Sequence, residues 1–159
     1  MNHTNVENFE DVSRVHIQSS DDFRSDQARE LYEWWQSFTP KLPCRDDFKI
    51  EENWHIAPNL FLIECLGDGK FLYRLNGEEV RNLVGKNQAG SYFSLEGETP
   101  ELVNLAKYLD GLRQIKKPIR CIGSLAFFGK TKKQFESLDC PLFDENGNVT
   151  FIIGIIVGL

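Results

Sequence analysis

The spacing of apolar residues changes along the chain and divides it into segments. Residues 1–20 are polar and show no sustained period, which predicts a flexible or loosely docked lead-in. Over residues 21–39 apolar side chains recur at helical spacing, at positions 28, 31, 34 or 35, and 38, and Thr39-Pro40 ends the pattern. This part of the chain therefore predicts an amphipathic N-terminal helix.

The pattern changes to that of strands near residue 58. Before it, the connector PKLPCRDDFKIEEN has room for one short helical turn at residues 46–52. After it, two apolar runs flank Gly67-Asp68-Gly69, whose residues accept positive φ angles. The sequence from residue 58 to residue 77 therefore predicts a β-hairpin.

Two helices of unequal length are expected next. Asn76 with Glu79 resembles a capping box that opens a short helix, and Gly85 follows its last apolar residue as a left-handed C-cap. We interpret Gly77, Gly85 and Gly90 as the turn into this helix, its end and the end of the following loop. A longer helix is predicted over residues 99–116, with Thr99 as its N-cap.

Three strands complete the pattern: IRCIGSLAFF, KQFESLDCPLF and VTFIIGIIV. The last of these is apolar at almost every position, which is typical of a strand with both faces covered. The two central helices can cover one face. The N-terminal helix, from the same chain or from a second subunit, can cover the other.

Composition and charge narrow the class of protein. The chain has 159 residues, 41% of them hydrophobic and 26% charged, which suits one soluble domain. A net charge of −6 and a pI near 5.1 argue against nucleic acid and anionic membranes as main partners. The start of the chain lacks the pattern of a secretory signal, and no apolar run is long enough to span a bilayer, so we expect a cytoplasmic protein. Four widely spaced cysteines predict free thiols.

Three short motifs within residues 27–157 carry a resemblance to a known family. They are Leu31-Tyr32-x-x-Trp35, Leu42-Pro43-x-Arg45-x-Asp47 and Tyr73-Arg74-Leu75-x-Gly77. Together with the order of strands and helices, they resemble a bacterial branch of PAS domains that often occur as single-domain proteins.

The resemblance implies an α+β fold: a five-stranded antiparallel PAS sheet with the central helices on one face and the N-terminal helix on the other. It divides the chain into a lead-in (1–20), the N-terminal helix (21–39) and a PAS core (40–159). It also implies a cavity under the short helix, which in PAS domains holds a ligand or lies empty. Assuming that Glu64 and Arg74 point outward, the candidate cavity residues are Phe61, Ile63, Tyr73, Val80, Leu83, Tyr92, Phe93, Leu105, Leu109 and Ile122. All of them suit a filled core as well.

Cofactor and catalytic motifs are sparse. The Asn-Cys-Arg-Phe-Leu-Gln-like segment of a flavin photosensor is absent, and residues 99–116 contain no histidine that could hold haem, so we expect neither cofactor. The widely spaced cysteines, with no cluster of histidines beside them, also argue against a metal site. His55 is interpreted as a structural residue. Glu136 or Asp139 could face the cavity, although we expect solvent-facing or edge positions. No catalytic set is apparent, and a small α+β barrel enzyme is the least favoured alternative.

One basic run could form a binding surface. Seven cations and no acid lie between residues 111 and 135: Arg113, Lys116, Lys117, Arg120, Lys130, Lys132 and Lys133. The simplest interpretation is a solvated helix end and turn, and the alternative is a patch for an anion or an acidic partner.

The sequence thus favours a sensor or adaptor that binds a small apolar or amphipathic ligand and signals through an unknown protein partner. The alternative is a ligand-free interaction module with a filled core. Aromatic residues of the N-terminal helix exceed one narrow stripe, which predicts a homodimer built around Trp34, Trp35, Phe38, Ile153 and Ile155.

Overall fold

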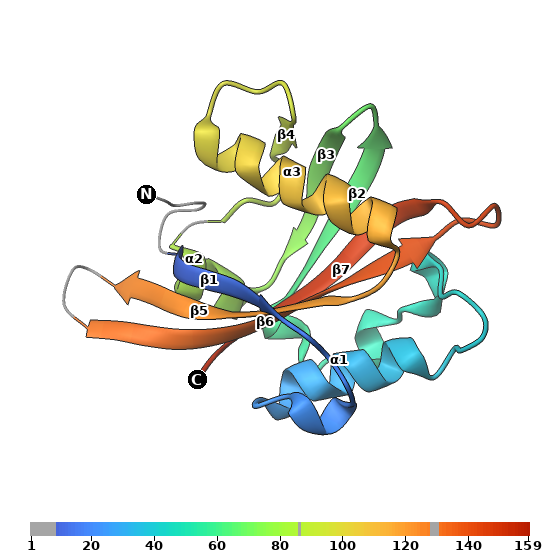
Figure 1. Cartoon of the computed structure of the whole chain (residues 1–159), viewed down its shortest axis with the longest axis horizontal. Coiled ribbons are helices and arrows are strands. Elements are labelled where there is room, and N and C mark those ends of the chain that lie inside the picture. Colours follow the sequence, from blue (N-terminus) through green and yellow to red (C-terminus); the bar gives the residue numbers. More distant parts are fainter. Residues whose placement is uncertain (1–8, 86, 128–130) are drawn as a thin grey trace.

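The computed structural model describes residues 9–85, 87–127 and 131–159, and within them it shows an antiparallel sheet with helices on both faces (Figure 1). Seven strands of the described residues follow one another across the sheet in the order β1-β5-β6-β7-β2-β3-β4. Their bounds are β1 Phe9–Val15, β2 Leu60–Gly67, β3 Lys70–Asn76, β4 Tyr92–Ser94, β5 Ile119–Phe127, β6 Thr131–Phe143 and β7 Val149–Gly158. The α+β class is therefore confirmed.

The five predicted strands form the middle of the sheet, and two strands that the sequence did not predict extend its edges. β4 pairs with β3, and β1 pairs with β5 from Phe9↔Leu125 to Val15↔Arg120. Residues 9–15 were expected in a lead-in without regular structure, so the structure corrects that boundary. Their sequence, FEDVSRV, lacks a clear strand pattern, and the hydrogen bonds offered by the edge of β5 hold it in place.

Helices lie on opposite sides of this sheet, as the resemblance implied. α1 (Asp26–Gln36) packs on one face, whereas α2 (Glu78–Val84) and α3 (Pro100–Ile115) pack on the other (Figure 1). The connector after α1 contains short 3₁₀ turns at Arg45–Asp47, Ile50–Glu52 and Ala57–Asn59. None of the helices in the described residues is long and apolar enough to cross a membrane.

The N-terminal helix is shorter than the predicted 21–39. Ser20–Asp22 forms a separate 3₁₀ turn, and Ser25 is the N-cap of α1, its Oγ accepting a hydrogen bond from the N–H of Ala28 at 3.3 Å. The acidic pair that suggested the earlier start belongs to this turn, where Asp22 accepts hydrogen bonds from the backbone N–H groups of Gln18 and Ser19. The carboxylate of Asp22 thus stabilises a turn rather than the helix.

The start of α2 also differs from the prediction. Gly77, not Asn76, occupies its N-cap, and no side-chain hydrogen bond caps it. With φ of −63°, Gly77 is conformationally ordinary, but a Cβ there would lie only 2.3 Å from the carbonyl oxygen of Pro58, so a side chain has no room. Gly85 ends the helix at φ 104°, which confirms the predicted left-handed C-cap.

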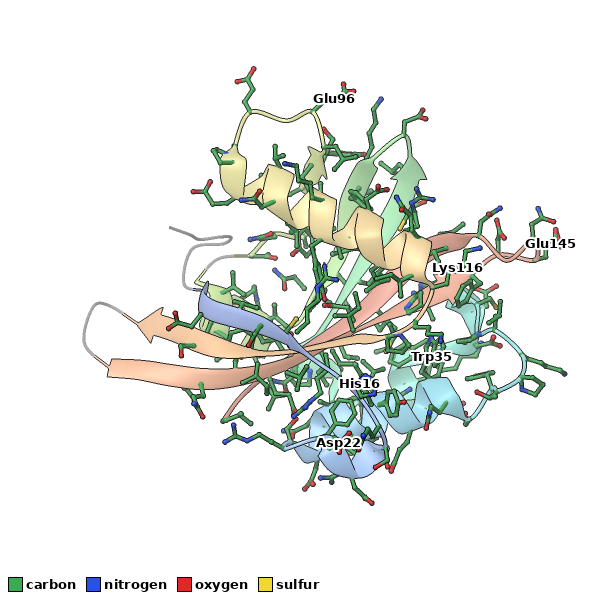
Figure 2. All side chains as sticks on the ribbon, in the orientation of Figure 1. His16, Asp22, Trp35, Glu96, Lys116 and Glu145 are labelled. Atoms are coloured by element: carbon green, nitrogen blue, oxygen red, sulfur yellow. The ribbon has the colours of Figure 1, made fainter. Side chains whose placement is uncertain are left out.

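Apolar side chains fill both sides of the sheet (Figure 2). Ile153 and Ile155 of β7 pack in the cluster under α1, whereas Ile152 and Ile156 of the same strand pack in the clusters under α3 and α2. Alternate residues of one strand point to opposite faces, so the nearly continuous apolar run of β7 is explained by cover on both sides. This confirms the expectation for the last strand.

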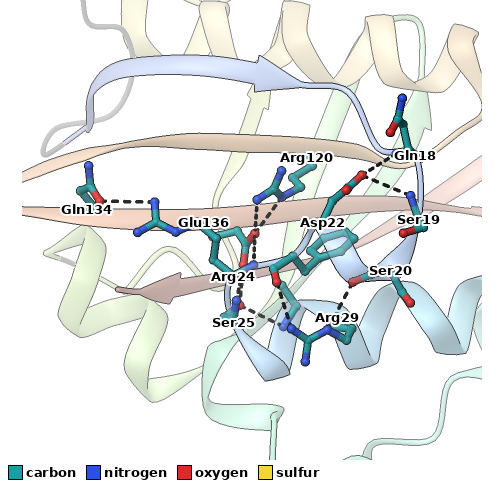
Figure 3. A network of polar contacts seen from close by, with 12 residues as sticks. Gln18, Ser19, Ser20, Asp22, Arg24, Ser25, Arg29, Arg120, Gln134 and Glu136 are labelled. Atoms are coloured by element: carbon teal, nitrogen blue, oxygen red, sulfur yellow. Dashed lines mark hydrogen bonds and ion pairs between the residues drawn. The ribbon is translucent and has the colours of Figure 1, made fainter.

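A buried carboxylate on β6 anchors α1 to the sheet (Figure 3). Glu136, which is 0% exposed, accepts hydrogen bonds from the N–H of Arg24 at 3.0 Å, from Ser25 N and Oγ at 2.8 and 2.7 Å, and from Arg120 Nε at 2.7 Å. Burial raises the pKa of Glu136, but these donors outweigh it and hold the pKa below its ordinary value. The predicted solvent-facing position of Glu136 is therefore wrong.

Candidate ligand cavity

A cavity of about 350 Å³ lies between the sheet and the helices α2 and α3. Its volume is at the lower end of the range for small-molecule sites, about 300–1,000 Å³. Most of its wall is apolar, and every strand except β4, together with both helices, contributes to it. The apolar and aromatic lining residues are Val12, Phe61, Ile63, Tyr73, Val80, Val84, Leu105, Tyr108, Leu109, Cys121, Phe135 and Ile156.

Six of the ten candidate residues line this cavity: Phe61, Ile63, Tyr73, Val80, Leu105 and Leu109. Three others lie elsewhere. Leu83 packs in the core under α2, Phe93 stacks on Phe71 with ring centroids 5.4 Å apart, and Tyr92 is 69% exposed on the edge strand β4. The predicted facing was therefore right for β2 and for Tyr73 of β3, but it failed for Leu83 of α2 and for the two residues of β4.

Ile122 faces away from the cavity because the alternation of β5 is the reverse of the one assumed. Cys121 lines the cavity, and its neighbour Arg120 bonds Glu136 on the α1 side. Both alternating sets of β5 contain apolar residues, so the sequence pattern could not fix which set faces the helices. The register between β5 and β6 determines which set faces the cavity: Cys121 pairs with Ser137, and both residues line it.

A buried acid and a phenol face each other inside the cavity. The hydroxyl of Tyr108 on α3 donates to Asp139 Oδ2 of β6 at 2.5 Å, and it lies 4.0 Å from the thiol of Cys121. Burial raises the pKa of Asp139 to about 6, although the Tyr108 hydrogen bond and the Arg14 charge act in the opposite direction. Burial also raises the pKa of Tyr108, and that of Cys121 to about 11. Of the two acids considered on β6, Asp139 is thus the one that faces the cavity.

Two carboxamides add polar groups to the wall. Asn76 Oδ1 and Gln88 Oε1 are buried and have no hydrogen-bond partner among the described residues, and both side chains line the cavity. A buried acceptor without a donor is destabilising, so such groups commonly mark a place where a ligand or water binds. Asn76, predicted as a helix cap, is instead placed toward the cavity.

Gly154 makes room for the two groups that meet at the floor of the cavity. A Cβ on this residue would lie 2.2 Å from Cζ of Phe61 and 2.6 Å from Oδ1 of Asp139. Gly154 pairs with both residues across β7, opposite Phe61 on β2 and Asp139 on β6. Glycine is therefore required here so that an aromatic ring and a carboxylate can occupy the same space above the central strand.

The opening of the cavity lies between β1 and α3. Val12 of β1, which is 43% exposed, and Asn104 of α3, which is also exposed, both line the cavity, so the cavity reaches the surface at these residues. Arg14, on the same strand, places its guanidinium carbon 5.1 Å from the centre of the Tyr108 ring. β1 therefore forms part of the rim.

Sequence reasoning missed most of the polar wall. It did not single out the polar residues Gln88, Asn104, Tyr108 and Ser137, or the apolar Val12, all of which line the cavity. Asn104 and Tyr108 immediately precede Leu105 and Leu109 on α3, so a wider helical face would have included them. Gln88 lies in a loop, where no period predicts which residue turns inward.

The candidate interface residues are largely covered within the chain. Ile153 and Ile155 are 1% and 0% exposed beneath α1, which corrects their assignment to an interface with a second subunit. Trp34 is half-buried against Phe38 and Phe48, with ring centroids 5.0 Å away in both cases. Trp35 donates from Nε1 to the carbonyl oxygen of Pro141 at 2.8 Å and sits close to the sheet (Figure 2).

The basic run does not form one surface in the described part of the chain. Arg120 is 5% exposed and bound to Glu136, and Arg113 pairs with Asp110 at 3.0 Å. Lys116, Lys117 and Lys133 are exposed, whereas Lys130 and the side chain of Lys132 lie outside the described structure.

The remaining candidate groups have structural partners. His55 Nε2 contacts Glu30 Oε2, in keeping with its interpretation as a structural residue, and all four cysteines are free, as predicted. No cluster of His, Cys, Asp and Glu in the described residues is suited to holding a metal ion.

Comparison with known proteins adds a family and two distant structural similarities. A family model described as a PAS domain matches residues 23–157. No curated protein matches the sequence. A light-oxygen-voltage domain studied with a flavin analogue is 10% identical, with 69% of this chain and 83% of that chain covered and a TM-score of 0.49. The light-state LOV structure of the blue-light photoreceptor Aureochrome1 is 12% identical, with 70% and 89% covered and a TM-score of 0.45.

Proposed function

Because the chain belongs to the PAS domain family, we propose that it is a sensory signalling module whose cavity binds a small, largely apolar ligand. The unpaired buried acceptors of Asn76 and Gln88 carry this proposal, since a filled core has no use for two polar atoms without donors. A cavity of about 350 Å³ supports it against the alternative of a ligand-free module with a filled core.

The signal would leave through contact with another protein, which makes the chain an adaptor as well as a sensor. The cavity is lined by Val12 of edge strand β1 and by Asn104 of α3, both of which are surface-exposed, so a bound ligand would contact elements that another protein can also reach. We propose that this occurs in the cytoplasm and involves no catalytic step.

Native mass spectrometry of freshly purified protein tests the proposal. We expect a population heavier than the 18.3 kDa chain by the mass of a small molecule, which is lost on denaturation. Leu105→Trp should abolish this population because the larger ring fills the cavity. Leu102→Trp is the matched control, since Leu102 lies on the same helix, packs against the core and does not line the cavity. A bare chain mass for both the unaltered protein and the control would refute ligand binding.

A further inference from the structure

The charge of the cavity wall restricts the chemistry of its ligand. Of the described residues that line the cavity, Asp139 alone is charged at neutral pH, and none is lysine, arginine or histidine. Among the described residues, the charge of Arg14 acts on Asp139, and its guanidinium lies outside the cavity lining, exposed above the ring of Tyr108. An anionic ligand would therefore meet a carboxylate and find no basic partner inside the cavity.

Asp139 also has unused capacity to accept hydrogen bonds. An ionised carboxylate has about four acceptor positions, and the described residues supply one donor, the hydroxyl of Tyr108. The carboxamides of Asn76 and Gln88 can rotate to present either a donor or an acceptor, so they do not discriminate by charge. The carboxylate only accepts, and a buried carboxylate with one donor is destabilising until a further donor or a cation reaches it.

An aromatic ring lies beside the carboxylate. Phe61 and Asp139 both approach Gly154 so closely that no side chain could stand there. The ring of Tyr73 lies 6.4 Å from that of Phe61, so two aromatic rings adjoin this part of the cavity. Aromatic faces attract cations, and they also pack well against an apolar ligand body.

From this combination we propose that the cavity selects a compact apolar molecule carrying a protonated amine, which binds Asp139 while its apolar part contacts Phe61 and the helices. The inference rests on the proposed function, because it names the ligand class of the same cavity. The ammonium group would supply the donor and the charge that Asp139 lacks, and the carboxamides would bind further polar groups of the ligand.

Three probes of similar shape and different charge test the inference by calorimetry on the full chain: phenethylamine, phenethyl alcohol and hydrocinnamate. We expect phenethylamine to bind at least about tenfold more tightly than phenethyl alcohol, as for a hydrogen bond between charged groups relative to a neutral one. Hydrocinnamate should bind most weakly. Equal affinity for amine and alcohol, preference for hydrocinnamate, or no binding of the amine at millimolar concentration would overturn the inference.

Asp139→Asn should remove the preference for the amine, because the amide keeps the shape and loses the charge. Asp68→Asn is the control: the same chemical change in the exposed β2–β3 turn, at a φ of 54° that asparagine also tolerates. Circular dichroism and thermal unfolding would verify that both variants fold. Retention of the amine preference in Asp139→Asn would overturn the inference.

A pH series on the unaltered chain gives the same test without a substitution. Asp139 is protonated as the pH falls through about 6, so amine affinity should fall over this interval and alcohol affinity should not. The groups facing Asp139 are Tyr108 on α3, Cys121 on β5 and Arg14 on β1, while β7 and β2 present Gly154 and Phe61. Tyr108 and Cys121 titrate at higher pH and arginine stays charged, so none of them produces this change.

The two proposals fail in different ways. Suppose that phenethylamine and phenethyl alcohol bind with equal affinity and that neither binds Leu105→Trp. This result would overturn the inference of an amine ligand but would leave the cavity as a ligand-binding site. A bare chain mass in native mass spectrometry, for both the unaltered protein and Leu102→Trp, would refute the proposed function itself.

Discussion

At the scale of single residues, Glu136 and Asp139 have different roles although they lie only three residues apart on the same strand. Both acids are on β6, but their side chains lie on opposite faces of the sheet. Glu136 has five donor contacts from Arg24, Ser25 and Arg120, whereas Asp139 has one from Tyr108. The burial of both acids raises their pKa values, and only the donors of Glu136 reverse the direction. One acid is thus structural, and the other is available to a ligand.

Glu136→Gln should lower the free energy of unfolding by about 3–5 kcal/mol, because it leaves the buried guanidinium of Arg120 without its counter-charge. Urea denaturation measures the change. The control is Glu64→Gln, which removes a partly exposed pair with Arg74 at 3.7 Å and should change stability by less than about 1 kcal/mol.

The pH dependence of this difference follows from the lowered pKa of Glu136. The stabilisation is present above the pKa of the unfolded chain, about 4.3, and is lost as the pH falls through the lower folded-state value. The stability gap between the unaltered protein and Glu136→Gln should therefore be constant from neutral pH to about 5 and shrink below about 4. A gap that widens in acid would contradict this account.

At the scale of elements, the two helix N-caps differ in a way that can be measured. Ser25 accepts from the N–H of Ala28 and donates to Glu136, while Thr99, the N-cap of α3, makes no capping hydrogen bond. Ser25→Ala should therefore cost about 0.5–2 kcal/mol from the cap alone, with the lost bond to Glu136 in addition. Thr99→Ala should stay within about 0.5 kcal/mol. Chemical denaturation of both variants decides, and equal losses would mean that the caps are not the source of the difference.

The elements also show what the sequence could and could not predict. Hydrophobic period and turn residues were enough for the five central strands, α2 and α3, because each has a local pattern. β1 depends on pairing with β5, more than a hundred positions away in the sequence, and has no clear pattern of its own. The facing of β5 and the inward turn of Gln88 depend on register and loop packing, which a single sequence does not encode locally. Hence six cavity residues were predicted and the polar wall was mostly missed.

At the scale of the whole molecule, we still predict a homodimer, now through the outer surface of α1 rather than through β7. Ile153 and Ile155 are covered, but Trp34, Trp35 and Phe38 keep partly exposed aromatic surface on one side of the molecule. Light scattering should give twice the chain mass of 18.3 kDa, and Phe38→Glu should reduce it to the mass of one chain. Leu66→Glu is the control, because Leu66 is an exposed apolar residue near the end of β2 and does not belong to α1. This substitution should leave the dimer intact. A concentration-independent monomer mass for the unaltered protein would contradict the prediction.

The central claim, that the cavity is where a small molecule binds, is tested most directly by nuclear magnetic resonance of the ¹⁵N-labelled chain during titration with phenethyl alcohol. This neutral probe does not depend on the proposed charge of the ligand. We predict the largest shifts for amide groups of α2, α3 and the central strands, and for the side-chain amides of Asn76 and Gln88, whose unpaired oxygens line the cavity. Shifts confined to the outer surface of α1 or to the exposed Trp54, or no shifts at all, would contradict it.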